Sequence, residues 1–276
     1  MAVAPRREFV AASFNVHAGV DGWGRSHDVL GVCQSIDADL LVMQESWRPQ
    51  GGESIAGLVA SELGYQLCEV QLAQARLAQP QAGATDRWLG PLGWRTAGHA
   101  ILLHSERPLR ARVTRSQTWA TAAPGSWELA VLSRLPVMES RVLPLAQLSR
   151  DRAKRAVVAT VVDVGGCKIG FAGTHMSHLS HGSALHFRAV AKMLDGVFED
   201  IPVVFAGDMN LWGPPIHAFM GQWRRAVKGK TWPAWRPHSQ LDHLLVRGLE
   251  VRAAGVWPVS GSDHRPVWAR LALPGA

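Results

Sequence analysis

The stretch 156–176, AVVATVVDVGGCKIGFAGTHM, contains two apolar runs separated by Gly165-Gly166. Both runs are rich in the β-branched and aromatic residues that are typical of strands. A Gly-Gly pair supplies the positive φ angles that a two-residue hairpin turn requires. The stretch therefore predicts two consecutive antiparallel strands. A purely parallel sheet, in which a crossover separates neighbouring strands, contains no such pair.

On both sides of this hairpin the chain alternates between strand and helix patterns. Helices are predicted at 26–37, with Ser26 as N-cap, at 53–63, ending at Gly64, and at 184–198. The other predicted strands cover 8–16, 40–43, 98–104, 109–115, 128–132, 137–143, 202–206, 241–246, 249–256 and 266–272. Too many of them follow one another directly for a doubly wound sheet. The order favours an α/β fold, namely a four-layer α-β-β-α sandwich of two mixed sheets flanked by helices.

The remaining segments are predicted to be loops, at 74–97, 116–127 and 211–240, and we expect substrate specificity to lie in them. The chain has 276 residues, of which 47% are hydrophobic, and it shows no linker and no repeat. We therefore expect one catalytic domain over residues 1–276.

Location is predicted from what the sequence lacks. The N-terminus has no apolar signal-peptide core, and no run of about 18 apolar residues could span a bilayer. The three cysteines form no CxxC pair, which is typical of a reducing compartment. We expect a cytoplasmic protein without a transmembrane segment, acting as a monomer.

The formal net charge is +7 and the isoelectric point is about 10.0. A basic balance suits a partner such as nucleic acid, a phosphorylated metabolite or an anionic lipid surface, although solubility alone also explains it. Two basic clusters could hold phosphates, but solvated faces are the more usual interpretation. The clusters are Arg150, Arg152, Lys154 and Arg155, and Arg224, Arg225, Lys228 and Lys230.

Polar residues follow the ends of the strongest apolar strands. Loops at strand ends, held by a rigid sheet, are where functional sites are commonly built. The residues are Asn15, Glu45, His175, Asp208, Asn210, Asp242, Asp263 and His264. Each has a structural explanation when taken alone; for example, Asp208 and Asn210 could simply form an Asx turn.

The ligand types in this set predict a hard metal ion. Carboxylate and carboxamide oxygens select Mg2+, with Mn2+ or Ca2+ as the other possible ions, over Zn2+ or Cu2+. A bound cation neutralises the negative charge that develops on a phosphoester in the transition state, and histidines transfer protons near neutral pH. The set therefore predicts a Mg2+-dependent phosphoester hydrolase. Zinc held by His175, His178 and His181 is a weaker alternative, because the three lie between a strand and a helix.

Seven motifs occur in an order that resembles the endonuclease/exonuclease/phosphatase superfamily over nearly the whole chain. They are SFNVH (13–17), DADLLVMQES (37–46), LAVLSRLPV (129–137), GTHMSH (173–178), FAGDMN (205–210), LDHLLV (241–246) and SDHRPV (262–267). The resemblance implies a DNase I-like fold and a Mg2+-dependent phosphodiesterase, nuclease or phosphatase. The substrate it implies is a phosphoester, such as nucleic acid or an anionic phospholipid.

The resemblance also implies a role for each residue. Asn15 and Glu45 would bind the metal, helped by Asp263. Asp208 and Asn210 would position the attacking water and the phosphate, and His175 would contact the scissile phosphate. Asp242 would orient an active-site histidine, and His264 would be the second catalytic histidine. Either His264 or Asp208 could take the proton of the water.

Two departures and two alternatives bear on this interpretation. GTHMSH stands where exonuclease III-type enzymes carry Asn-x-Tyr-x-Pro-Asn, which favours the DNase, sphingomyelinase and phosphatase side. Trp127-Glu128 stands where a small Gly-Asn-like pair often precedes the strand. One alternative is a catalytically inactive phosphate-binding module, which we would expect to have lost Glu45, Asp208 or His264. The other is a two-metal phosphoesterase of the calcineurin-like type, whose Gly-Asn-His-Glu/Asp segment this chain lacks.

Overall fold

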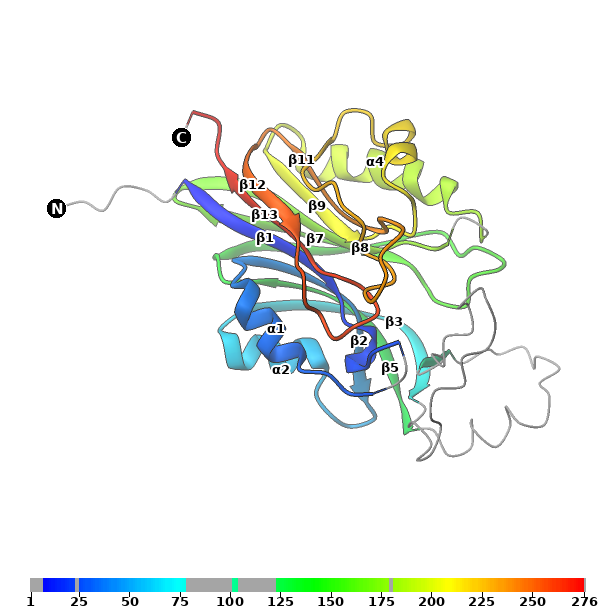
Figure 1. Cartoon of the computed structure of the whole chain (residues 1–276). Helices are drawn as coiled ribbons and strands as arrows, with labels where there is room; N and C mark the ends of the chain where they lie inside the picture. Colours follow the sequence, from blue (N-terminus) through cyan, green and yellow to red (C-terminus); the bar gives the residue numbers. More distant parts are fainter. Residues whose placement is uncertain (1–6, 23–24, 78–100, 104–122, 179–180, 276) are drawn as a thin grey trace.

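The computed structural model describes residues 7–22, 25–77, 101–103, 123–178 and 181–275. Two β-sheets pack face to face, and helices cover their outer faces (Figure 1). Helices α1 (Val29–Ile36) and α2 (Ile55–Leu63) pack on the first sheet, and α4 (Ala184–Phe198) packs on the second. The predicted four-layer α-β-β-α sandwich is confirmed.

Both sheets are mixed, as predicted. Within the described residues the first has the order β12-β13-β1-β2-β5-β3-β4 and the second the order β10-β11-β9-β8-β7-β6. Strands β1 and β2 are parallel in the first sheet and β8 and β9 in the second, and the other pairs are antiparallel. The bounds of the first sheet are β12 Glu250–Val256, β13 Val267–Ala272, β1 Glu8–Asn15, β2 Leu40–Pro49, β5 Ala123–Ser133, β3 Gln66–Leu77 and β4 Ile101–Leu103. Those of the second are β10 Arg224–Arg225, β11 Asp242–Arg247, β9 Val203–Asp208, β8 Cys167–His175, β7 Ala156–Val164 and β6 Val137–Pro144.

The period of two along each strand separates the core into layers. Phe9 and Ala11 of β1 lie in the cluster between the two sheets, whereas Ala12 and Phe14 lie in the cluster under α1 and α2. Successive side chains of a strand point to opposite faces, so this alternation buries both faces of β1. Burial of each large apolar side chain contributes about 1.5–3 kcal/mol. The alternation also decides which strand-end side chains meet between the sheets.

The predicted hairpin is confirmed. Strands β7 and β8 pair from Val157 opposite Thr174 to Val164 opposite Cys167. Gly165 and Gly166 form the turn with φ angles of 59° and 88°. Only glycine adopts such a pair of angles without strain from a Cβ atom.

Several predicted boundaries were wrong. Helix α1 begins at Val29, and Asp28 rather than Ser26 is its N-cap, since an Asp28 carboxylate oxygen accepts a hydrogen bond from the Gly31 N–H at 2.8 Å. Strand β2 continues beyond Met43 to Pro49, and β5 starts at Ala123, inside a predicted loop. Strand β3 was not predicted, because its frequent polar residues weaken the apolar signal; it takes residues 74–77 from the predicted loop at 74–97. The rest of that loop and the strand predicted at 109–115 lie outside the described residues.

Cys33, Cys68 and Cys167 are all free thiols. No helix within the described ranges is both long and apolar enough to cross a membrane.

Candidate active site

Strand register brings three of the predicted residues together at one end of the second sheet. His175 of β8 pairs with Asp208 of β9, and Asp208 pairs with Asp242 of β11. Residues directly opposite on neighbouring strands point to the same face of a sheet. Ala206 and Leu244, two residues from Asp208 and Asp242, lie in the core between the sheets. The three polar side chains therefore continue this inner face where the apolar core ends.

Asn15 connects the two sheets. It ends β1, and its Nδ2 donates to Glu45 Oε1 and to Asp208 Oδ2, both at 3.1 Å. Its Oδ1 accepts a hydrogen bond from the His17 N–H at 3.1 Å. The carboxamide oxygen is the only side-chain atom of Asn15 that could bind a cation, and here it accepts a hydrogen bond from the backbone. Metal binding by Asn15 stays a prediction, whereas its bridging of two carboxylates is a feature of this structure.

Glu45 reaches the site through a β-bulge. Leu41 and Met43 of the same strand lie in the cluster under the helices, so strict alternation would point residue 45 the same way. The register with β5 shifts between Gln44 and Ser46, and Glu45 has a left-handed φ of 58°. Its side chain is 16% exposed, and its Oε1 lies 3.9 Å from His175 Nε2. Bulges often redirect a side chain next to a functional site, and such backbone strain costs about 1–3 kcal/mol.

His264 is held by Asp242. Its Nδ1 lies 2.8 Å from Asp242 Oδ2, and its Nε2 lies 3.7 Å from Asp208 Oδ2. Burial alone would lower the pKa of His264, but the charges of Asp242, Asp263 and Asp208 raise it well above its ordinary value. The surrounding carboxylates therefore favour the protonated ring, in which Nδ1–H donates to Asp242.

The pKa of His175 is shifted in the opposite direction to that of His264. Its Nε2 lies 3.5 Å from Asp208 Oδ2, and its ring packs edge-on against Trp127, with centroids 5.0 Å apart. Burial, the charge of Arg155 and the charge of His264 together hold the pKa of His175 well below its ordinary value. The pKa values of the two histidines are thus shifted in opposite directions, and both rings lie within 4 Å of the same carboxylate oxygen.

Asp208 lies at the centre of the site. Its Oδ1 accepts from the Asn210 N–H at 2.9 Å, so the Asx turn allowed by the sequence is present and coexists with the site. Asn210 Nδ2 donates to the Met176 carbonyl at 3.0 Å and lies 3.4 Å from His175 Nε2. Burial, with the charges of Asp242 and Glu45, raises the pKa of Asp208 to about 7, although His264 opposes the shift.

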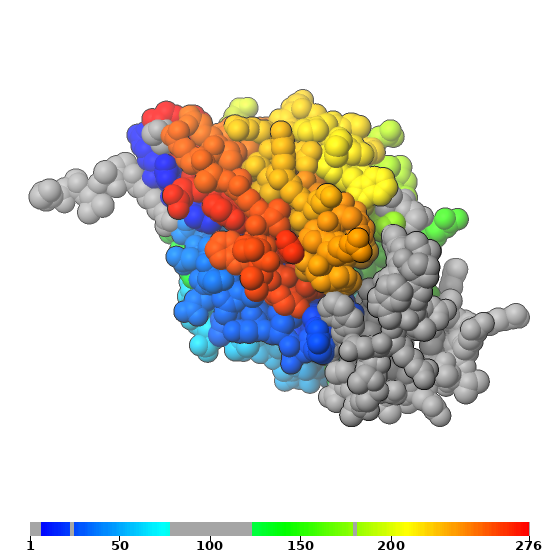
Figure 2. All heavy atoms as spheres, viewed as in Figure 1, coloured from blue at the N-terminus to red at the C-terminus, as the bar shows by residue number. Residues whose placement is uncertain are grey.

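Asp263 completes the set. Its Oδ2 accepts from Trp232 Nε1 at 3.3 Å, and its Oδ1 lies 3.7 Å from His17 Nδ1. The segments that carry Trp232 and Asp263 lie side by side on the surface (Figure 2), where the Ala234 N–H donates to the Asp263 carbonyl at 2.7 Å. All eight predicted site residues therefore gather at one end of the sandwich.

The donor set fits a hard divalent cation. Four acidic side chains, those of Glu45, Asp208, Asp242 and Asp263, lie close to His264. Burial raises the pKa of Glu45, and the charge of Asp263 adds to the shift. Buried negative charge of this kind is compensated in proteins by a bound cation, and oxygen donors suit Mg2+. Asp208, Asp242 and His264 each offer one atom within 4.8 Å of the others, but Asp242 and His264 already bind each other, so Glu45 and Asp263 are the freer ligands.

Sequence analysis missed the residues that support the site from behind. Arg155 is only 8% exposed, in contrast to the solvated face expected for its cluster. It donates to the His175 carbonyl at 3.3 Å, lies 5.2 Å over the Trp127 ring, and pairs with Asp151 at 2.8 Å. In the sequence, the burial of Arg155 was indicated only by its position directly before the apolar run of β7. His17, which contacts both Asn15 and Asp263, was visible only as part of the SFNVH motif.

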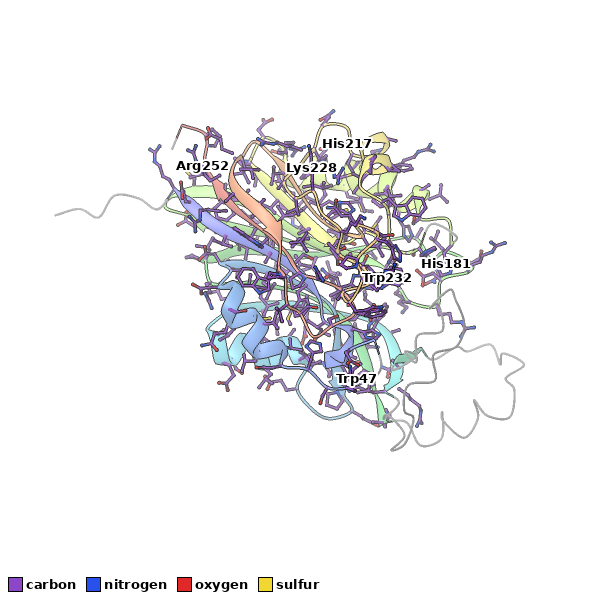
Figure 3. The ribbon with its side chains drawn as sticks, in the orientation of Figure 1. Trp47, His181, His217, Lys228, Trp232 and Arg252 are labelled. Atoms are coloured by element: carbon purple, nitrogen blue, oxygen red, sulfur yellow. The ribbon has the colours of Figure 1, made fainter. Side chains whose placement is uncertain are left out.

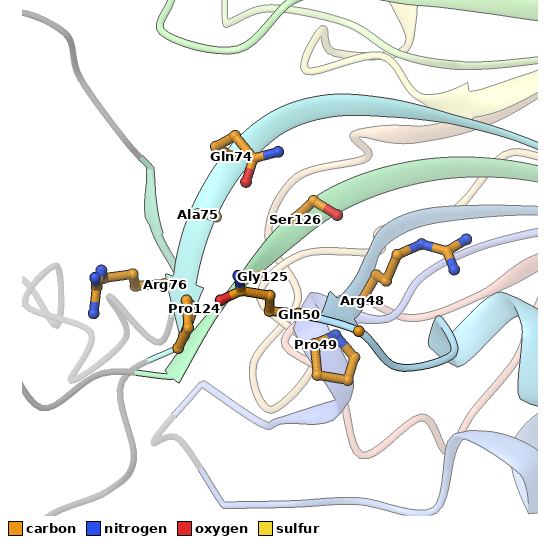
Figure 4. Close-up of a pocket in the computed structure, with 10 residues that line it drawn as sticks. Arg48, Pro49, Gln50, Gln74, Ala75, Arg76, Pro124, Gly125 and Ser126 are labelled. Carbon is orange, nitrogen blue, oxygen red and sulfur yellow. The ribbon is translucent and has the colours of Figure 1, made fainter.

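A groove of about 490 Å³ lies at the ends of β2, β3 and β5 (Figure 4). Arg48, Gln74 and Arg76 are among the residues that line it, and none of the eight predicted site residues is. Arg48 is already paired with Glu69 and lies 3.5 Å from Glu128.

Comparisons with known proteins agree with this geometry. The family model described as Endonuclease/Exonuclease/phosphatase family matches residues 12–264. No curated protein matches the sequence significantly. Among solved structures, an endonuclease/exonuclease/phosphatase from Beutenbergia cavernae DSM 12333 has a TM-score of 0.62 at 19% identity, covering 98% of this chain and 73% of its own.

Two further structures are similar in fold. The mannosyl-6-phosphatase of Bacteroides thetaiotaomicron VPI-5482 has a TM-score of 0.62 at 14% identity, covering 96% of this chain and 100% of its own. The human Nocturnin catalytic domain, solved with a bound sulfate anion, has a TM-score of 0.61 at 16% identity, covering 98% and 96%. Identities this low show a shared fold and leave the substrate open.

Proposed function

This chain belongs to the endonuclease/exonuclease/phosphatase family, and from that premise we propose that it is a Mg2+-dependent phosphoester hydrolase that directs a water in line at phosphorus. The observation that carries the proposal is the cluster of four carboxylates and two histidines, in which both histidines lie within 4 Å of Asp208 Oδ2. The fold is shared with a protein named as a phosphatase and with one that binds sulfate, an anion similar to phosphate. Asn15 and His264, near the two ends of the matched region, contribute to one site, which supports a single catalytic domain.

We propose that Glu45 and Asp263 hold the metal ion, with Asn15 as a third contact. Mg2+ usually takes one or two protein carboxylates and keeps its other positions for water and substrate. When bound, the ion supplies Lewis-acid stabilisation of the charge that develops on the phosphoryl oxygens. Asn15, by bridging Glu45 and Asp208, sets the spacing between the metal side and the water side of the site.

Asp208 is our candidate for the general base. A base works best when its pKa lies near the operating pH, and that of Asp208 is about 7. The Asn210 N–H fixes Oδ1, so Oδ2 is the atom directed toward both histidines and toward a water between them. His264 is less suited to accept the proton, because the surrounding carboxylates keep it protonated.

The two histidines then serve the phosphate. His264, oriented by Asp242, offers a positive charge and an Nε2–H to a phosphoryl oxygen. His175, neutral and held edge-on against Trp127, offers an uncharged hydrogen bond to the same group. Such prearranged donors stabilise the transition state more than the ground state, because the charge on the phosphoryl oxygens grows as the reaction proceeds.

The test is a hydrolysis panel over plasmid DNA, RNA, phosphoinositides, sphingomyelin and bis(p-nitrophenyl) phosphate. The protein is first stripped with a chelator and then assayed with and without added Mg2+. We expect turnover of at least one substrate, dependent on Mg2+ and lost in Asp208→Asn. A matched control is Asp195→Asn on α4, which lies on the outer face of the second sheet. Turnover that survives complete chelation, or no turnover on any substrate, would reject the proposal.

A further inference from the structure

A second hollow, of about 540 Å³, adjoins the candidate active site on the side of β9 and β11. One wall is the segment 212–214, which begins two residues after Asn210. The opposite wall is the segment 238–240, which ends two residues before Asp242. His243 Nε2 lies 2.8 Å from the Leu211 carbonyl and ties the two walls together. We call this hollow the β9–β11 pocket.

The charged Lys and Arg side chains that line the β9–β11 pocket are all positive. Arg225, Lys228 and Lys230 line it, and no Asp or Glu is among its lining residues. Figure 3 shows Lys228 on the same segment as Trp232, whose indole binds Asp263. This segment therefore belongs both to the pocket and to the edge of the active site.

Arg225 is built into the wall of the pocket. Its Nη2 donates to Gln240 Oε1 at 2.5 Å, and Gln240 Nε2 donates to the Asp242 carbonyl at 3.3 Å. A Cβ atom at Gly213 would lie only 2.1 Å from the Arg225 guanidinium, so glycine is what allows this close packing. Arg225 as a whole is partly exposed, and Gln240 holds its guanidinium in position. A positively charged group that is fixed in this way suits an anion.

We propose that the β9–β11 pocket binds a second phosphate group of the substrate, next to the phosphate that is cleaved. The inference rests on the proposed function and adds the substrate class, a phosphoester with two or more phosphates. Guanidinium and ammonium groups are the usual protein ligands of phosphate, and Arg225, Lys228 and Lys230 bring one guanidinium and two ammonium groups to the pocket. Trp212, 59% exposed at the rim, offers a flat surface to the group that connects the two phosphates.

The first experiment measures binding without catalysis. Inorganic pyrophosphate is titrated calorimetrically into the metal-free protein, in which the carboxylate cluster repels anions and the pocket does not. We expect one site in the wild type and at least about tenfold weaker binding in Lys228→Gln/Lys230→Gln, given that each charge-assisted hydrogen bond is worth about 1.5–3 kcal/mol. Lys168→Gln/Lys192→Gln removes the same charge from exposed positions elsewhere on β8 and α4 and should bind like the wild type.

The second experiment compares two chromogenic substrates in Mg2+, the p-nitrophenyl ester of thymidine 5′-phosphate and the same ester with an added 3′-phosphate. The pocket double variant should raise KM for the second substrate at least about tenfold more than KM for the first. Equal effects on both substrates, or equal pyrophosphate binding by the two double variants, would overturn the inference. If pyrophosphate binds in the pocket but neither ester nor any substrate of the hydrolysis panel is turned over, the proposed function fails while the anion site stands.

Discussion

Single residues in this site are strained or charged at a cost to stability, and the cost is greatest at Glu45. Its backbone is left-handed at φ 58°, and its carboxylate lies among other carboxylates. Burial raises the pKa of Glu45, so above the ordinary pKa of a glutamate the ionised side chain favours unfolding. Residues that oppose folding in this way are retained when they serve function.

Glu45→Gln should therefore separate stability from activity. We expect the metal-free variant to melt a few degrees higher than the wild type, the shift that roughly 1 kcal/mol produces in a chain of this size. Because a neutral amide is a poor substitute for a carboxylate ligand, Mg2+-dependent turnover should fall at least about 100-fold. Calorimetric melting in chelator and steady-state kinetics measure the two effects. A lower melting temperature would contradict the inference that the ionised Glu45 side chain destabilises the fold. Full turnover would contradict its role as a metal ligand.

His264→Ala should lower kcat by about 10²–10⁴, the usual loss when a side chain that takes part in acid–base catalysis is removed. The variant should also have a lower free energy of unfolding, because the buried Asp242 carboxylate loses its partner, so kcat is measured at a temperature at which circular dichroism shows the variant to be folded. The matched control is His217→Ala, an exposed histidine in the short 3-10 helix Pro214–Ala218, which should keep wild-type kcat. Wild-type turnover in the His264 variant would show that its contact with Asp208 has no catalytic role.

At the scale of elements, the end of β8 is supported by a buried ion pair rather than by apolar packing alone. Asp151 pairs with Arg155 at 2.8 Å and accepts a short hydrogen bond from Ser177, which follows β8. Arg155 in turn holds the His175 carbonyl and covers Trp127. The loop before β7 and the loop after β8 are thereby fixed to each other behind the catalytic face.

Asp151→Asn should lower the free energy of unfolding by about 3–5 kcal/mol at pH 7, because it leaves the buried Arg155 charge unpaired. Burial would raise the pKa of Asp151, but Arg155 and Ser177 hold it below its ordinary value. A depressed pKa stabilises the fold above the unfolded-state value of about 3.9, and this stability is lost as the pH falls through the folded-state value. The difference between variant and wild type should therefore shrink below about pH 4. Denaturant unfolding at several pH values measures it.

The matched control for this pair is Glu139→Gln, which removes an exposed ion pair to Arg141 on β6. Such surface pairs contribute about 0–1 kcal/mol, so the control should show little change at any pH. A loss in Asp151→Asn no larger than in Glu139→Gln would mean that the buried pair does not stabilise the loops next to His175.

At the scale of the whole molecule, the site is a junction between the two sheets. Glu45 and Asn15 come from the first sheet, and Asp208, His175 and Asp242 come from the second. Any ligand that binds this set holds the two sheets together at one end. Binding to the native state alone raises stability by mass action.

Mg2+ should accordingly raise the melting temperature, and a chelator should reverse the shift. At about 100 times the Kd the stabilisation is about 2.7 kcal/mol, which corresponds to several degrees here. In Glu45→Gln the Mg2+-dependent shift should be largely lost, whereas Glu139→Gln should shift like the wild type. An equal Mg2+ shift in both variants would place the metal elsewhere.

The net charge of +7 leads to a prediction about salt. If the substrate is a polyanion or an anionic surface, its contacts with basic side chains release counterions, and KM should rise steeply between roughly 50 and 200 mM salt. A small phosphoester held by short-range contacts should show a much shallower rise. The experiment compares the salt dependence of KM on DNA or anionic vesicles with that on bis(p-nitrophenyl) phosphate. A flat KM on the polyanions across this range would favour a small substrate.

The sequence alone predicted the order of the layers and the residue types of the candidate site. The Gly165-Gly166 hairpin, the period of two in β1 and the helix patterns at 53–63 and 184–198 are local signals, and each is encoded within about fifteen residues. The oxygen and imidazole ligands were equally visible, because the polar residues stand directly at the ends of apolar strands. Motif order then linked them into one expected site.

Only the tertiary structure decided how those residues act. The bulge that turns Glu45 inward depends on the register of β2 with β5. The pKa values of His175 and His264 are shifted in opposite directions by carboxylates and an arginine that are distant in the chain. The burial of Arg155 depends likewise on contacts between separate segments. Such properties arise from distances between segments, and no local pattern carries them. Hydrogen-bond geometry and Coulomb interactions vary over a few ångströms, a scale that only the packed sheets fix.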